Sequence, residues 1–161
     1  VDNNWKDRNV IEESISDIDI AIKIYPWNNV FYVNKALLQT RTKDYQGLLE
    51  TNHKLVELNP NKPYYEAQRG LIYDLLRDSF NANIHYRKAQ ERYENDLKSI
   101  SQDDYQYQLE YIECLVVSGK EQKAKAVLNR LKIKHPNDEI LQIYPIKTKQ
   151  DIIDQINNNA L

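Results

Sequence analysis

Two similar short phrases end at Pro26 and Pro60, and the interval between them constrains the fold of this chain more than any other feature. The phrases are Ala-Ile-Lys-Ile-Tyr-Pro at 21–26 and Leu-Val-Glu-Leu-Asn-Pro at 55–60. A third, Leu-Lys-Ile-Lys-His-Pro, ends at Pro136, so the second interval is twice the first with a short insertion added. A fixed period of about 34 residues is typical of stacked helical hairpins. The spacing therefore predicts a chain built from helical repeats.

The segments between these phrases have the pattern of helices with one buried stripe, because apolar residues recur at three- and four-residue spacing. Proline ends such helices, since it has no amide hydrogen to donate within a helix. Only 3 glycines are present, too few for the tight turns of an all-β domain. We predict helices at 5–24, 29–42, 45–58, 63–77, 80–98, 104–117 and 121–134, and a weaker pair at 137–143 and 148–157.

The middle segment adds a residue pattern to the period. Counted from residue 63, small residues stand at positions 8, 20 and 27 (Gly70, Ala82 and Ala89) and aromatic residues at 11 and 24 (Tyr73 and Tyr86). This pattern resembles the tetratricopeptide repeat, which also has proline at position 32. In that family the small residues let two helices approach closely and the aromatic residues fill the gap beside them. The resemblance implies an all-α fold, a right-handed superhelix (solenoid) of stacked antiparallel helix pairs.

By this resemblance, residues 1–161 are expected to form a single domain. A partial repeat covers about 10–28, repeats cover 29–62, 63–96 and 105–138, and a C-terminal cap covers 139–161. The first full repeat departs from the family pattern at Gln39, Leu48 and Asn52, and the last has Ile112 in place of a small residue. The eight extra residues fall around 97–104, where a longer helix and a capping Ser-Gln-Asp-Asp stretch account for them.

Beyond Pro136 the repeat pattern fails, because Pro145 interrupts what would be the next helix. Terminal repeats need a polar outer face. The segment 151–156 suits that role, and we expect its isoleucines to cover the last hairpin while its other face meets water.

An ordinary antiparallel helix bundle is the alternative fold, since it too has amphipathic helices joined by Pro- and Asn-rich loops. The repeat is favoured because chance placement rarely reproduces both the spacing of the proline phrases and five matched positions in one repeat. Both folds are all-α.

Residues able to support catalysis or metal binding do not gather in the sequence. His53, His85 and His135 lie at three separate places, so a metal site has no local support. Cys114 has no CxxC partner and lies on an apolar stripe, which predicts a small buried residue rather than a nucleophile. The isolated glycines provide no phosphate-binding loop. We therefore predict no enzyme, no cofactor and no metal site.

In this family the first helix of each repeat faces a concave groove, through helix positions 2, 5, 6, 9, 12 and 13. The resemblance places there Val30, Val33, Asn34, Leu37, Thr40, Arg41, Tyr64, Ala67, Gln68, Leu71, Asp74, Leu75, Gln106, Leu109, Glu110, Glu113, Val116 and Val117. The partner-binding candidates selected from this set are Asn34, Arg41, Tyr64, Gln68, Leu71, Gln106 and Glu110.

Such a groove is apolar and amide-bearing rather than basic. A peptide in it would pack on Tyr64 and Leu71 and bond to the amides of Asn34 and Gln68. Packing against the neighbouring repeat is the alternative role for each residue, and it is favoured for Leu71 and Leu109. Chaperone-binding members of the family clamp a peptide carboxylate with Lys, Asn and Arg, and only Asn34 matches that clamp.

Four of the 12 tyrosines cluster at the starts of two predicted helices: Tyr64, Tyr65, Tyr105 and Tyr107. Tyrosine presents a large contact area at low entropy cost, so these residues are candidates for an aromatic patch at the groove edge. Aromatic residues on stacked helices also hold nucleobases in related RNA-reading repeats. Glu110 argues against this, because its carboxylate would face backbone phosphates.

The sequence therefore indicates a non-catalytic protein–protein interaction module, an adaptor or scaffold for a peptide or protein partner. The alternative is a structural segment of a larger solenoid or multidomain assembly, with self-association through the terminal repeats. The incomplete first repeat and the start at Val1 instead of Met motivate this alternative. An RNA-reading repeat is a third, disfavoured interpretation, because 22 Lys and Arg against 24 Asp and Glu leave no cationic field and no predicted nucleic-acid partner.

The compartment stays open between the cytoplasm and a bacterial cell envelope. No apolar stretch is long enough to span a bilayer, and charged residues follow Trp5 where a signal sequence would be apolar. A signal removed before Val1 would place the chain at the envelope. The abundance of Asn, Ile, Lys and Tyr fits a low-GC bacterium.

Overall fold

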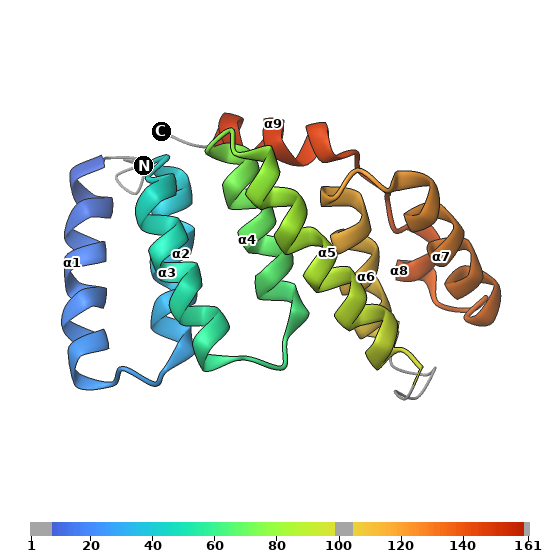
Figure 1. Ribbon diagram of the computed structural model, residues 1–161, viewed down its shortest axis with the longest axis horizontal. Coiled ribbons are helices and arrows are strands. Elements are labelled where there is room, and N and C mark those ends of the chain that lie inside the picture. Colours follow the sequence, from blue (N-terminus) through green and yellow to red (C-terminus); the bar gives the residue numbers. More distant parts are fainter. Residues whose placement is uncertain (1–7, 99–104, 160–161) are drawn as a thin grey trace.

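The computed structural model describes residues 8–98 and 105–159, and every regular element in these ranges is an α-helix. Helices α1 to α7 stand side by side in an elongated row, each antiparallel to the next, and α9 crosses one edge of the row (Figure 1). The helices are α1 (Arg8–Ile24), α2 (Asn29–Arg41), α3 (Tyr45–Leu58), α4 (Pro63–Leu75), α5 (Ser79–Asp96), α6 (Tyr105–Val117), α7 (Glu121–Lys134), α8 (Glu139–Ile143) and α9 (Lys149–Asn159).

Each predicted helix is present, with bounds close to those predicted. Helix α5 has 18 residues whereas α3 and α7 have 14 each, which confirms the longer helix expected before the insertion. The predicted helical residues 5–7 and the capping stretch at 101–104 lie outside the described residues.

The three proline phrases form loops with one backbone geometry, which lie between α1 and α2, between α3 and α4, and between α7 and α8. The residues before the prolines are Tyr25, Asn59 and His135. Each donates its amide to the carbonyl four residues back at 2.9–3.0 Å, and its own carbonyl accepts from the amide three residues on at 3.0–3.2 Å. Proline follows this last helical bond because it has no amide to continue the ladder. The sequence period is therefore also a period in backbone geometry.

The turns inside the three hairpins share a second geometry. Lys43, Arg77 and Gly119 have φ of 56°, 63° and 75°. In each turn the next residue donates its amide to the carbonyl five residues back, at 2.8–3.0 Å. This is the Schellman arrangement, which ends a helix with one residue in the left-handed region. The first two turns are separated by the same interval as Pro26 and Pro60, and the last lies further on by the eight extra residues, as the proline phrases predict.

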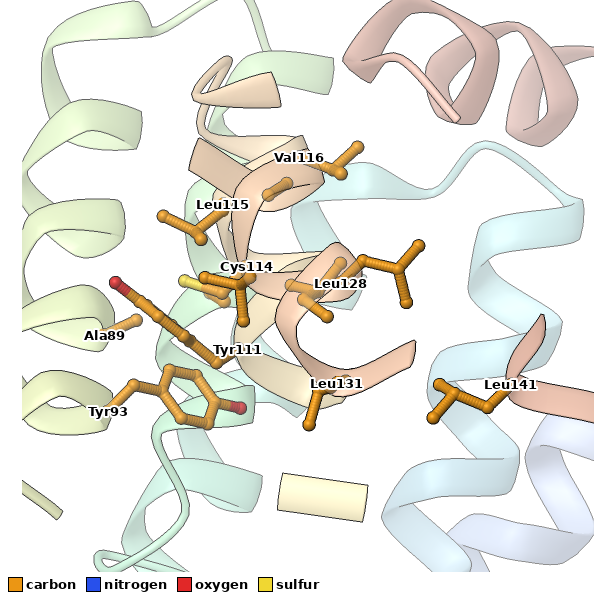
Figure 2. Close-up of a cluster of buried hydrophobic side chains, with 13 residues drawn as sticks. Ala89, Tyr93, Tyr111, Cys114, Leu115, Val116, Leu128, Leu131 and Leu141 are labelled. Atoms are coloured by element: carbon orange, nitrogen blue, oxygen red, sulfur yellow. The ribbon is translucent and has the colours of Figure 1, made fainter. Parts of the chain in front are cut away.

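The largest buried cluster joins α5, α6, α7 and α8 and includes Ala67 of α4. Its α7 members recur at three- and four-residue spacing, as expected for one buried stripe, whereas α6 is buried on most of its circumference from Tyr111 to Val117. Figure 2 shows this cluster, which includes Ala89, Tyr93, Tyr111, Cys114, Leu115, Val116, Leu128, Leu131 and Leu141.

Small residues bring α4 and α5 into close contact, as the repeat pattern predicts. Ala82 and Ala89 are 1% and 0% exposed, and Gly70 lies directly against the ring of Tyr86. The Tyr86 hydroxyl donates to Asp74 Oδ2 at 2.6 Å, so the polar end of this buried ring is satisfied.

In the first full hairpin, two of the three departures from the family pattern, Gln39 and Asn52, are buried polar residues that make hydrogen bonds. Thr51 Oγ1 donates to Gln39 Oε1 at 2.8 Å. Asn52 Nδ2 donates to the carbonyl of Tyr65 at 3.1 Å, and its Oδ1 accepts from Arg69 Nε at 3.0 Å. Buried polar groups are costly unless they are bonded, and here each finds a partner across the α2/α3 or α3/α4 contact.

The C-terminal helix contacts the last hairpin and extends beyond it. Helix α9 contacts α6 of that hairpin but continues back to α2, the first helix of the first full hairpin. Its Ile152, Ile153 and Ile156 pack against the cluster that holds Leu71 and Val117. The chain can turn in this direction because Pro145 interrupts the helical bonds between α8 and α9. The isoleucines of α9 thus contact the last hairpin, where the cap was expected, and the helix extends further to α2.

Candidate functional site

A cleft of about 880 Å³ lies between α2, α4, α6 and the C-terminal segment 144–159. Each of these three helices is the first of its hairpin. From the helices it is lined by Leu37, Thr40, Arg41, Tyr64, Ala67, Gln68, Leu71, Glu110, Ile112, Glu113, Cys114, Val116 and Val117. From the C-terminal segment it is lined by Tyr144, Pro145, Ile146, Lys147, Ile152, Gln155, Ile156, Asn158 and Asn159.

The inner surface of the cleft is apolar and held by the core. Ala67, Leu71 and Val116 are each 4–5% exposed and belong to the buried clusters behind the cleft. Their positions are therefore fixed before any ligand arrives. An aliphatic side chain buried on such a surface is stabilised by about 1.5–3 kcal/mol through the water that it excludes.

The rim of the cleft carries both signs of charge. Glu110 and Glu113 lie on α6, Arg41 lies on α2, and Lys147 lies in the C-terminal segment. Glu113 Oε1 accepts from the Tyr144 hydroxyl at 2.9 Å. Burial, together with this bond to a carboxylate, raises the pKa of Tyr144 to about 12. The rim is thus balanced in charge, and it joins α6 to the C-terminal segment through a protonated tyrosine.

Five of the seven predicted partner-binding residues line the cleft together: Arg41, Tyr64, Gln68, Leu71 and Glu110. The other two, Asn34 and Gln106, are exposed and lie before the lining residues of α2 and α6. Leu71 is only 5% exposed, so it packs in the core while its surface forms part of the cleft. Leu109 packs against the largest cluster, in agreement with the packing role favoured for it.

The repeat pattern did not reveal the part of the cleft that the C-terminal segment forms. Tyr144 and Ile146 come from the stretch between α8 and α9, and Ile152 and Ile156 come from α9. In the sequence, the only indication of this contribution was the stripe of isoleucines in α9. Such a stripe indicates that one helix face is buried, but it does not identify the surface against which that face packs.

The four clustered tyrosines do not form the single aromatic patch that their spacing suggested. Tyr64 and Tyr65 make an edge contact with ring centroids 5.4 Å apart, and only Tyr64 lines the cleft. The ring centroids of Tyr107 and Tyr93 are 5.0 Å apart, and those of Tyr105 and His135 are 5.5 Å apart. Burial, with a contribution from nearby carboxylates, raises the pKa of Tyr64, so its hydroxyl stays protonated at neutral pH.

Cys114 is buried, as predicted, and burial raises the pKa of its thiol to about 12. It therefore packs as a small apolar residue in the wall of the cleft. The histidines make separate local contacts, His53 with Glu57, His85 with Glu66 and His135 with the Tyr105 ring. Across residues 8–98 and 105–159, no three His, Cys, Asp or Glu side chains gather as metal ligands would.

The chain matches no protein-family model, no curated protein and no solved structure. Among the described helices, none has both the length and the apolar character needed to cross a bilayer. Any assignment of function therefore rests on the fold and the cleft.

Proposed function

We propose that this chain is a tetratricopeptide-like α-solenoid that acts as a non-catalytic interaction module and holds a peptide segment of a partner protein in the cleft. The observation that carries the proposal is the cleft itself, about 880 Å³ of space between three successive first helices. Its apolar inner surface and its balanced rim suit a peptide with aliphatic and polar side chains.

The repeated backbone geometry supports the solenoid part of the proposal. The left-handed residues of the hairpin turns, Lys43, Arg77 and Gly119, recur with the period of the proline phrases, and the loops at the prolines share one set of hydrogen bonds. Similar hairpins that stack with a regular rotation produce an extended concave face. A face of this kind is lined by the first helix of each hairpin, and α2, α4 and α6 occupy that position.

Packing and amide hydrogen bonds would hold the peptide. Its aliphatic side chains would cover Leu71 and Val116, which the core already fixes in place. The half-buried Gln68 lies at the cleft with one acceptor and two donor positions, enough to pair with a peptide group. Charged side chains of the peptide would pair with the charged residues of the rim, and these pairs would set the direction of the peptide in the cleft.

Peptide selection tests the proposal. A random peptide library is selected against the wild-type chain, and the enriched peptides are titrated against Gln68→Trp, which places a bulkier side chain without an acceptor in the cleft. Lys125→Trp, on the exposed side of α7, is the matched control. We expect Gln68→Trp to weaken binding by about tenfold or more, equivalent to about 1.4 kcal/mol, and the control to leave it unchanged. Failure to enrich any peptide, or equal binding by both variants, would contradict the proposal.

A second candidate function is a structural segment that stacks end to end with copies or neighbouring segments. It is favoured by isoleucines exposed at both ends of the row: Ile20 and Ile24 on α1 are 55% and 58% exposed, and Ile133 and Ile143 are 79% and 80% exposed. Exposed apolar groups of this kind mark association surfaces when they gather. Sedimentation velocity tests this candidate function. Stacking predicts association that rises with protein concentration and disappears in the Ile24→Ser variant. A monomer at every concentration would contradict it.

A further inference from the structure

The C-terminal helix already occupies part of the face assigned to the partner peptide. Ile152, Ile153 and Ile156 pack against Leu71 and Val117, and two of these isoleucines also line the cleft. Helix α9 crosses the ends of α4 and α6 in Figure 1. The chain thus shows directly what kind of ligand this face accepts: a short amphipathic helix with aliphatic side chains on one side.

Polar contacts hold α9 near both of its ends. Lys149 Nζ lies 2.5 Å from Asp74 Oδ2 and 5.0 Å from the centre of the Tyr86 ring. We call the Lys149–Asp74 contact the latch. Near the other end, the Tyr45 hydroxyl donates to Asn157 Oδ1 at 3.2 Å. With α9 in place the Asp74 side chain is 10% exposed, so a nearly buried carboxylate is paired with the cation of Lys149.

The attachment of α9 is weaker than that of the helices it covers. None of its residues is buried, whereas α4 and α6 each bury six. The connecting stretch 144–148 has no helical structure and includes Pro145. An element with few buried contacts and an exposed backbone opens at a lower free energy than the rest of the fold. Helix α9 can therefore leave the face while the hairpins stay folded.

We propose that α9 is a displaceable wall of the cleft, and that the physiological partner is an amphipathic helix that takes its place against α4 and α6. The partner helix places aliphatic side chains where Ile152 and Ile156 lie, and it carries a lysine or arginine three residues before the first of them to meet Asp74. This inference rests on the proposed function, because it names the class of partner for the same face.

Tethering decides how strongly α9 competes. A short linker holds a segment at an effective concentration of about 1 mM next to its site. A free helix that makes only the contacts of α9 must therefore exceed that concentration to displace it. Weakening the latch lowers the competition without altering the face, so the affinity for an added helix should rise.

The test uses the full chain and a fluorescent synthetic peptide with the sequence of residues 144–159. Lys149→Glu places a carboxylate against Asp74 and opens the latch. Lys125→Glu makes the same change of charge on the exposed side of α7, away from α9, and serves as the matched control. We expect Lys149→Glu to bind the peptide at least about tenfold more tightly than wild type, with Lys125→Glu equal to wild type. Ile153→Ser, which weakens the same docking without a change of charge, should behave like Lys149→Glu.

Three results would overturn the proposal. The first is equal peptide affinity in the wild-type, Lys149→Glu and Ile153→Ser chains. The second is dimerisation of Lys149→Glu by exchange of α9, which would make a second copy the occupant. The third is binding of the library-selected peptides to wild type and Lys149→Glu with equal affinity, which would leave the proposed function standing without displacement of α9. If neither the selected peptides nor the synthetic peptide bind any chain, the proposed function falls as well.

Discussion

A side-chain carbon on Gly70 would lie 2.6 Å from both Cδ1 and Cε1 of the Tyr86 ring. The ring has little freedom to move aside, because its hydroxyl donates to Asp74 at 2.6 Å and Lys149 lies over its face. The distance between α4 and α5 is therefore set by the missing side chain at residue 70. The same ring also supports the end of α9, which connects hairpin packing to the cleft.

Gly70→Ala is expected to lower the free energy of unfolding by about 1–3 kcal/mol through overpacking against Tyr86. The substitution also gains about 1 kcal/mol of helix propensity, so a loss would show that packing outweighs propensity. Urea unfolding measures the change. Asn83→Ala, on the exposed side of α5, is the control and should stay within about 0.5 kcal/mol of wild type. A Gly70→Ala variant as stable as wild type would mean that the two helices separate freely.

Arg77→Gly is expected to raise the free energy of unfolding by about 0.5–1 kcal/mol, because Arg77 occupies a backbone region that favours glycine. Arg77 has φ of 63° in a hairpin turn, where the third repeat has Gly119 with φ of 75°. A residue with a side chain is destabilised by about 1–2 kcal/mol in this region, and glycine removes that cost. Part of the gain is lost again because glycine has more conformational freedom in the unfolded chain. Thermal or urea unfolding measures the change, and Arg87→Gly inside α5 is the control that should destabilise. A less stable Arg77→Gly variant would show that the shared turn geometry is wrong.

The contact between Glu66 and His85 predicts a pH dependence. Glu66 Oε2 lies 2.7 Å from His85 Nδ1, and this hydrogen bond lowers the pKa of Glu66. A carboxyl group with a lowered pKa stabilises the fold above its unfolded pKa of about 4.3, and the stabilisation is lost as the pH falls through the folded value. Glu66→Gln should therefore reduce stability by about 1 kcal/mol near neutral pH, and the difference from wild type should vanish in acid.

Glu57 provides the control for this pH dependence, since its exposed side chain contacts Lys54 at 2.7 Å and His53 at 2.9 Å. Solvent screens such a pair, so Glu57→Gln should change stability little at any pH. Urea unfolding of both variants between neutral pH and acid separates the two cases. Identical behaviour would contradict the role assigned to the half-buried pair.

Cys114 should resist thiol reagents until the chain unfolds. Burial raises the pKa of its thiol to about 12, so the thiolate is about a thousandfold rarer at neutral pH than in a free cysteine. Labelling with an aromatic disulfide that releases a coloured thiolate should be slow in the native chain. The labelling rate should rise with urea concentration as the unfolded fraction rises. Rapid labelling of the native chain would show that the cleft wall opens to solvent.

Local signals made most of the fold predictable. Pro26, Pro60 and Pro136 end helices through the missing amide, and the repeat period carries this geometry from one hairpin to the next. The course of α9 was not predictable, because its isoleucine stripe requires a buried face without specifying where that face is. The surface it meets is assembled from Leu71 and Val117, which only the tertiary structure brings together.

The candidate site was predictable to the same extent. The repeat register places Tyr64, Gln68 and Leu71 on one face of α4, and all three line the cleft. Asn34 and Gln106 were assigned to the groove by the same register, yet they lie outside the cleft. The limits of the cleft depend on where the C-terminal segment lies, and no helical period contains that information.

The central claim is that a partner peptide binds between α2, α4 and α6. Its most direct test is amide chemical-shift mapping of the full chain as a library-selected peptide is added. The account predicts perturbations at residues 37–41, 64–71 and 110–117, joined by those of α9 as that helix is released. Perturbations confined to the second helices of the hairpins, α3, α5 and α7, would contradict the account.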